Sequence, residues 1–271
     1  MFGKRIATAL IGLPIAIFLI TLGGLPFLTI IGVISLIGLY EFYKATSGKI
    51  LPVHIAGYTS VPIYFFILHS SSDVLHLFLL GIILLLVVLA MLVLLYKTVS
   101  ITDCAITIFG FYYIPVLFSF AYMTREHYLG SFFVWIIFIS AWGSDSGAYI
   151  FGKLFGRNKL APVLSPKKTV EGALGGVFVA ALIAFAYAAL MLRFSSIDID
   201  EAIPVVLICV ISGAVGSVFS QFGDLAASAI KRNSNIKDYG NIFPGHGGVM
   251  DRFDSVLFTA PCVFILIYFL A

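Results

Sequence analysis

Acidic side chains in the second half of the chain stand at or near the ends of apolar segments, beside polar stretches rich in Lys and Arg. The carboxylates are Asp145, Glu171, Asp224, Asp251 and Asp254. The polar stretches are SPKKTVEG at 165–172 and SAIKRNSNIKDYGNIFPGHGGVMDRFD at 228–254. Carboxylate oxygens suit hard divalent cations such as Mg²⁺, and Lys and Arg suit phosphate oxygens. The pattern predicts a site for a cation and phosphate groups.

The shorter stretch leads directly into a predicted helix. Ser165, Lys167, Lys168 and Thr169 precede an apolar run that starts near residue 170. The first turn of a helix presents unpaired backbone N–H groups and the positive end of the helix dipole, and both favour phosphate. We expect these four residues to bind substrate. A basic loop also arises from membrane topology alone, so the longer stretch is the stronger evidence for a functional site.

The longer stretch combines several kinds of group. Phosphate partners are available in Lys231, Arg232, Lys237 and Arg252, and metal ligands or orienting groups in Asp238, Asp251 and Asp254. The glycine-rich run 244–248 permits a close backbone approach to a ligand. His246 lies among these glycines, where a packing role is unfavourable, so the pattern favours binding or proton transfer.

The elements that must position these groups are membrane helices. Of the 271 residues, 61% are hydrophobic and 11% are charged, and the mean hydropathy is +1.10. Soluble domains carry about 25% charged residues. The composition therefore excludes a soluble globular enzyme, a disordered chain and a secreted disulfide scaffold. The net charge of +3 is attributed to membrane topology, and no nucleic acid partner is expected.

About nine apolar runs approach the roughly 20 residues that a membrane-spanning helix needs. They lie near residues 6–22, 26–43, 53–69, 74–96, 102–122, 131–151, 170–192, 203–229 and 254–270. All of the 16 Lys and Arg residues except Arg125 and Arg193 then fall on one side, which the positive-inside rule makes the cytoplasm. The prediction is an all-α, polytopic integral membrane protein with a cytoplasmic N-terminus, in the inner (cytoplasmic) membrane.

The composition of the chain changes near residue 130. Residues 1–130 are almost uniformly apolar and hold about five of the predicted spans. Residues 131–271 hold about four, with ionisable residues inside them and cytoplasmic loops near 152–169 and 230–253. An ionisable group at the centre of a span costs roughly 2.5–3.5 kcal/mol on insertion. The second region is therefore the predicted catalytic region, with its site facing the cytoplasm.

A structural interpretation of some of these residues stays open. A single Asp or Ser in a span often serves helix association, and Gly143/Gly147 and Gly172/Gly176 have the spacing of close helix packing. Helical spacing also places one polar stripe on the eighth predicted span, formed by Ser217, Ser220, Gln221, Asp224 and Ser228. Several carboxylates at one depth beside basic loops nevertheless favour a cation site.

The longer stretch resembles the signature of the phosphatidate cytidylyltransferase (CDP-diacylglycerol synthase) family. The matching residues are Ser228, Lys231-Arg232, Lys237-Asp238, Gly240, Pro244, His246-Gly247-Gly248, Asp251-Arg252 and Asp254. WGSDSGAY around Asp145, SPKKTVEG and QFGDLAASAIKR around Asp224 are similar to secondary motifs of that family. The resemblance implies the Mg²⁺-dependent reaction CTP + phosphatidate → CDP-diacylglycerol + pyrophosphate.

Roles for individual residues follow from the site pattern and this resemblance together. The expected catalytic residues are Asp145, Asp224, Lys237, Asp238, His246, Asp251, Arg252 and Asp254. The expected substrate-binding residues are Ser165, Lys167, Lys168, Thr169, Ser228, Lys231 and Arg232. Asp224 and Asp251 are the predicted ligands of Mg²⁺, with a second cation left open. CTP and phosphatidate are the expected substrates, the bilayer is the surroundings, and small-residue stripes are compatible with a homodimer.

Two other functions fit parts of the pattern. Intramembrane aspartates also suit another nucleotide-dependent lipid transferase, although the DG…AR…G…D…D pattern of CDP-alcohol transferases is absent from the sequence. A cation-coupled transporter would carry its site near the midplane, at broken helices in repeated halves. The chain has no evident halves, and its polar cluster is off-centre.

Overall fold

The computed structural model describes residues 14–71, 73–194, 199–242 and 247–270. Residues 14–22 are helical. Helices and strands then follow in the order α2 (Gly24–Ser47), α3 (His54–Ser70), α4 (Val74–Leu94), α5 (Ile101–Phe111), the π-helix η1 (Tyr112–Val116), α6 (Leu117–Glu126), α7 (Gly130–Phe155), β1 (Lys159–Ala161), β2 (Ser165–Thr169), α8 (Val170–Leu192), α9 (Ile199–Asn233) and α10 (Met250–Leu270).

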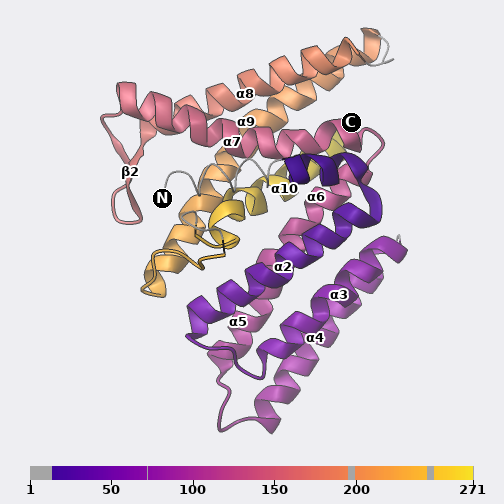
Figure 1. Ribbon diagram of the computed structural model, residues 1–271, viewed down its shortest axis with the longest axis vertical. Helices are drawn as coiled ribbons and strands as arrows, with labels where there is room; N and C mark the ends of the chain where they lie inside the picture. The colour runs from indigo at the N-terminus through magenta and orange to yellow at the C-terminus, as the bar shows by residue number, and fades with distance from the viewer. Residues whose placement is uncertain (1–13, 72, 195–198, 243–246, 271) are drawn as a thin grey trace. The chain divides into compact units, whose positions relative to one another are not determined.

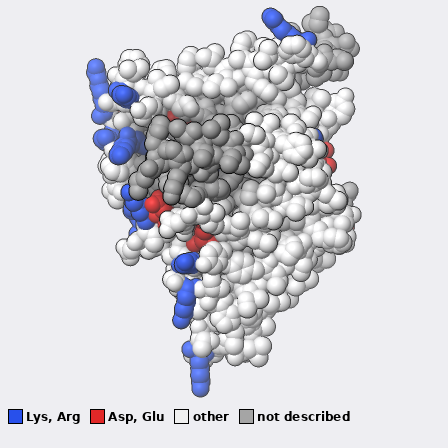
Figure 2. All heavy atoms as spheres, viewed as in Figure 1, with Lys and Arg blue, Asp and Glu red and all other residues white. Residues whose placement is uncertain are grey.

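Within the described residues, seven helical segments are long and apolar enough to cross a membrane. They are α2, α4, Ile101–Glu126, α7, α8, α9 from Ile203 and α10. The predicted span at 53–69 forms the 17-residue helix α3, and part of the span at 6–22 lies outside the described residues. Figure 2 shows a face that is almost wholly uncharged, with Lys and Arg in small groups. These features confirm an all-α, multi-pass membrane protein, while the count of nine stays a prediction.

Helix α4 shows why the surroundings must be apolar. Its buried residues are Leu80, Gly81, Leu84 and Val88, which form one stripe at helical spacing. The rest of the helix is equally hydrophobic, and residues such as Phe78 and Leu86 are exposed. A helix that is apolar all round but buries a single stripe is suited to face lipid.

The chain forms two compact units. The first contains residues 1–122 and 233–252, and the second contains residues 123–232 and 253–271. In the first, α3 packs against α2, α4 and α5 (Figure 1). Met250, the first residue of α10, lies against Gly38 of α2, where an added methyl group would meet its sulfur at 3.2 Å. The start of α10 thus packs against α2.

Glycines let the helices of the second unit approach closely. Helices α7 and α8 lie side by side (Figure 1). A methyl group at Gly147 of α7 would lie 2.6 Å from the Gly175 carbonyl oxygen and 2.8 Å from the Val179 Cβ. At Gly143 it would lie 3.1 Å from the Ala180 Cα. The predicted role of Gly143 and Gly147 in helix packing is confirmed.

The close approach at Gly147 has a measurable consequence. Replacing Gly147 by Ala is expected to destabilise the protein by about 1–3 kcal/mol, because the inserted methyl group must displace packed backbone. The apparent melting temperature in detergent measures this loss. Gly32→Ala is the matched control, since a methyl group there meets only Phe65 ring carbons, at 3.6 and 3.9 Å. Equal melting temperatures for the two variants would contradict the packing described.

A β-hairpin lies within the segment predicted as a cytoplasmic loop at 152–169. Strands β1 and β2 are antiparallel, with Lys159 opposite Thr169 and Ala161 opposite Ser165. Glu171 accepts hydrogen bonds from the Arg157 and Asn158 backbone N–H groups at 3.0 and 3.1 Å. The Thr169 hydroxyl accepts from the Gly172 N–H at 3.1 Å and so caps α8. Glu171, predicted to join the carboxylate cluster, therefore anchors the start of the hairpin.

Candidate functional site

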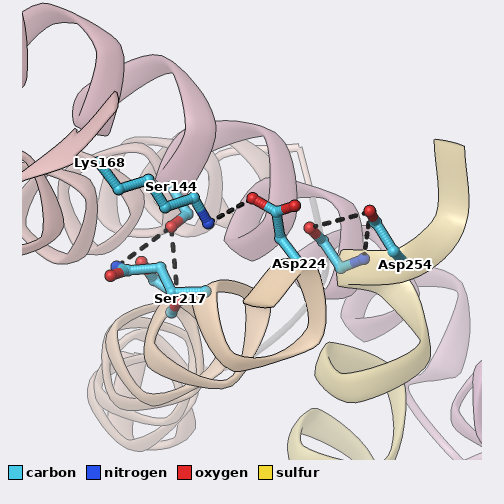
Figure 3. A network of polar contacts seen from close by, with 7 residues as sticks. Ser144, Lys168, Ser217, Asp224 and Asp254 are labelled. Carbon is cyan, nitrogen blue, oxygen red and sulfur yellow. Dashed lines mark hydrogen bonds and ion pairs between the residues drawn. The ribbon is translucent and has the colours of Figure 1, made fainter. Parts of the chain in front are cut away.

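An ion pair joins the hairpin to α9 in the second unit. Lys168 Nζ, on β2, pairs with Asp224 Oδ2, on α9 (Figure 3). The two side chains are 24% and 32% exposed, so the pair is partly shielded but open to solvent. The structure thus brings together a basic residue from the shorter predicted stretch and a carboxylate from the eighth predicted span.

Two further carboxylates stand close to this pair. Asp254, on α10, lies near enough to interact electrostatically with Asp224, Asp145 and Lys231. Its Oδ1 accepts a hydrogen bond from the Ser255 N–H at 2.7 Å. Figure 3 shows Asp224 and Asp254 on neighbouring helices. Acidic groups from α7, α9 and α10 and basic groups from β2 and α9 therefore meet in one cluster.

A cavity of about 200 Å³ opens beside the cluster. Its polar lining comes from α7, the hairpin and α9: Asp145, Lys167, Lys168, Thr169 and Gln221. Ala148, Tyr149, Leu160, Gly172 and Ala173 complete the walls. Predicted substrate-binding residues and a predicted catalytic carboxylate thus share one concave surface.

Buried polar groups continue the cluster into the helices. Gln221 Nε2 donates to the Ala173 carbonyl at 3.1 Å and to Ser144 Oγ at 3.4 Å. Ser144 Oγ in turn donates to the Ser217 carbonyl at 3.4 Å (Figure 3). The Ser217 and Ser220 side chains are fully buried. The polar stripe predicted on α9 therefore faces the protein interior, where Gln221 links α9 to α7 and α8.

The remaining predicted residues have individual places. Ser165 begins β2, and Ser228 and Arg232 lie towards the end of α9, which extends to Asn233. Four of them belong to the first unit: Lys237, Asp238, Asp251 and Arg252. His246 lies outside the described residues.

We call residues 237–242 and 247–252 the signature segment. Within it, Asp251 Oδ2 accepts hydrogen bonds from the Tyr239 N–H at 2.8 Å and the Gly248 N–H at 3.0 Å. The predicted metal ligand therefore also organises the backbone of its own segment. Lys237, Asp238 and Arg252 are exposed, so their charged groups are available to a ligand.

Sequence reasoning missed one carboxylate of the first unit. Glu41, on α2, is 2% exposed and accepts hydrogen bonds from the Val249 and Met250 N–H groups at 3.0 and 2.9 Å. The available signal was an acidic residue inside the predicted span 26–43, a position that is expensive for any ionisable group.

The donor set suits a cation, although the described residues contain no ready-made metal group. Among them, no three His, Cys, Asp or Glu side chains lie close enough together to hold a metal ion. Asp224 is paired with Lys168, while Asp254 lies in the field of Asp224 and Asp145. Accumulated carboxylate charge of this kind favours a hard divalent cation with retained waters.

Comparisons with known proteins agree with the motifs. The model of the family described as "Cytidylyltransferase family" matches residues 3–270. Phosphatidate cytidylyltransferase from Staphylococcus aureus (strain COL) is 34% identical over 267 residues, which cover 97% of this chain and 98% of that protein. The enzyme of the same name from Staphylococcus haemolyticus (strain JCSC1435) is 34% identical over 265 residues, covering 97% and 98%. With a match that spans nearly its whole length, the chain belongs to the cytidylyltransferase family.

Proposed function

We propose that the protein is a phosphatidate cytidylyltransferase, which converts CTP and phosphatidate into CDP-diacylglycerol and pyrophosphate. The observation that carries the proposal is the cavity beside the Lys168–Asp224 pair, where Lys167, Lys168 and Asp145 share one wall. One substrate is a lipid phosphate and the other a triphosphate, so their union needs basic groups and a cation at one place. Near-full-length similarity to proteins named phosphatidate cytidylyltransferase supports this choice of substrates.

The hairpin and the start of α8 are suited to hold phosphate. Lys167 and Lys168 occupy the strand that leads into α8. The α8 N-terminus contributes the positive end of its dipole beside the same cavity. Lys168 is already paired with Asp224, so a phosphate that engages Lys168 must compete with this carboxylate or share the lysine with it. Binding and release of substrate are therefore coupled to the charge state around Asp224.

A divalent cation fits the reaction. Asp224 and Asp251 remain our proposed ligands of Mg²⁺, with Asp254 and Asp145 beside Asp224 as supporting carboxylates. When bound, the ion would neutralise charge on the triphosphate and stabilise the departing pyrophosphate. The protein contributes positioning and charge complementarity, which carry most of the catalysis in phosphoryl-type transfer.

The transfer is proposed to be direct. A phosphate oxygen of phosphatidate attacks the α-phosphorus of CTP, the new P–O bond forms, and the bond to the β-phosphate oxygen breaks to release pyrophosphate. The attacking oxygen is already anionic, so it needs relief from charge repulsion more than a strong base.

Direct transfer predicts no exchange of labelled pyrophosphate into CTP when phosphatidate is rigorously absent. The experiment measures label in CTP after incubation of the detergent-purified protein with CTP, Mg²⁺ and labelled pyrophosphate. A covalent cytidylyl-enzyme would instead support exchange. Robust exchange that disappears in His246→Ala would contradict direct transfer and indicate a covalent cytidylyl intermediate on that histidine.

The membrane arrangement completes the proposal. We place the protein in the inner (cytoplasmic) membrane with about nine spans, a cytoplasmic N-terminus and the site at the cytoplasmic face, since nearly all Lys and Arg residues then lie inside. Phosphatidate can then reach the site from the inner leaflet and CTP from the cytosol. A homodimer stays a prediction from the sequence, since Gly143 and Gly147 pack against α8 of the same chain.

Pyrophosphate release in detergent micelles tests the function. The purified protein is supplied with CTP and Mg²⁺, with phosphatidate or phosphatidylglycerol as the lipid. We expect release with phosphatidate only, and little with ATP in place of CTP. Pyrophosphate release with a different lipid acceptor would favour another lipid transferase. No release with any lipid, together with consumption of a cation gradient in vesicles, would favour a transporter.

A further inference from the structure

We propose that Glu41 is a positioning residue that holds the signature segment in its working conformation. The catalytic consequence of this role rests on the proposed function, whereas the structural role stands on the geometry of the first unit. Glu41 comes from α2, about 200 residues before the segment that it contacts. Nothing in the resemblance to known motifs involves this residue.

The contact uses both oxygens of a buried carboxylate. Glu41 Oε1 accepts from the Val249 N–H at 3.0 Å, and Oε2 accepts from the Met250 N–H at 2.9 Å. These N–H groups lie at the start of α10, where a helix leaves its first donors without intrahelical partners. A carboxylate there gains from the helix dipole as well. Glu41 therefore caps α10 from a different helix.

The backbone of the signature segment is shaped around this carboxylate. A methyl group built at Gly240 would overlap Glu41 Oε1, and one at Gly248 would overlap both carboxylate oxygens. Glycine is needed at both positions because the backbone presses directly on the Glu41 side chain. Gly240 and Gly248 are thus sites of close packing against Glu41.

Asp251 extends the same arrangement. Its Oδ2 holds the Tyr239 and Gly248 N–H groups, so Glu41 and Asp251 together engage the successive N–H groups of Gly248, Val249 and Met250. Lys237 and Asp238 immediately precede Tyr239, and Arg252 immediately follows Asp251. Holding this backbone in place therefore positions the Cα atoms of the exposed charged residues of the segment.

The first test replaces Glu41 by Gln, which keeps the size of the side chain but places an NH₂ group against one of the two N–H donors. Asp73→Asn is the matched control, because Asp73 also caps a helix by accepting the Leu75 N–H, at 2.8 Å, but on α4 and at an exposed position. We expect kcat to fall about 10–100-fold in Glu41→Gln, the usual range for groups that orient a site. The KM for CTP and the activity of Asp73→Asn should change little.

A spectroscopic readout separates positioning from a general loss of fold. A nitroxide is attached at Asn241→Cys, an exposed position of the segment, in a protein whose native Cys104, Cys209 and Cys262 are buried. The spectrum should sharpen in Glu41→Gln and stay unchanged in Asp73→Asn. Wild-type kcat, or an unchanged spectrum, in Glu41→Gln would overturn the proposal. The spectrum does not depend on turnover, so an inactive wild-type protein would reject the proposed function without affecting this test.

Glu41→Asp keeps the inference falsifiable if the Gln variant cannot be purified. Asp preserves the charge and withdraws the carboxylate by one methylene, so space opens beside Gly248. Gly248→Ala should therefore lower kcat strongly in the wild-type background and much less in the Glu41→Asp background. Additive effects of the two substitutions, which are typical of residues that do not touch, would overturn the inference.

Discussion

Asp224→Asn is expected to lower the cytidylyltransferase rate by about 10³-fold, about 4 kcal/mol of transition-state stabilisation, because it removes a negative charge from the proposed binding site of the cation. Asn keeps the size of the side chain but leaves Lys168 without its counter-charge. It also removes a proposed ligand of Mg²⁺. The measurement is the steady-state rate at saturating CTP and phosphatidate, together with the Mg²⁺ concentration needed for half-maximal rate.

Two comparisons make the Asp224 result interpretable. Asp73→Asn changes the same chemical group at an exposed helix N-cap, where Asn serves as well as Asp, and it should retain the wild-type rate. The rate of Asp251→Asn should fall as far as the rate of Asp224→Asn if both carboxylates hold the ion. A near wild-type rate with unchanged Mg²⁺ dependence in either variant would remove that residue from the metal assignment.

Lys168→Gln is expected to lower kcat/KM for CTP about 10–100-fold, the value of one or two charge-assisted hydrogen bonds to phosphate. Lys167→Gln is the matched control on the same strand. Lys167 is exposed, whereas Lys168 is half-buried and paired with Asp224, so the loss should be several times smaller at Lys167. Equal losses at the two positions would mean that the hairpin supplies only general positive charge.

Hydropathy predicted most of the fold because lipid imposes a simple rule on each long apolar run. Prediction from hydropathy fails for elements too short to show a periodic pattern. Strands Lys159–Ala161 and Ser165–Thr169 are too brief and too polar to show alternation, and the hairpin depends on Glu171 holding the backbone of residues 157 and 158. The helical segment Ile101–Glu126 contains a π-helix that includes Pro115, where proline removes a backbone donor.

The charged cluster of the candidate site was predictable from residue types and positions alone. Asp145, Asp224, Lys168 and Asp254 were expected from their types and positions, and the structure brings them into one cluster. The backbone hydrogen bonds made by some carboxylates were not predictable. Glu171 and Asp251 use oxygens to hold backbone N–H groups, and such pairings depend on the folded path of the chain. Glu41 illustrates this best, because its partners lie at the opposite end of the sequence.

The most direct test of the central claim follows the α-phosphate of CTP. Protein in micelles that contain phosphatidate and Mg²⁺ is given CTP labelled at the α-phosphorus, and label extracted into organic solvent is compared with pyrophosphate released. The proposed function predicts one labelled lipid for each pyrophosphate, with both products lost together in Asp224→Asn. Pyrophosphate released without labelled lipid, or equal lipid labelling by Asp224→Asn and the wild-type protein, would contradict it.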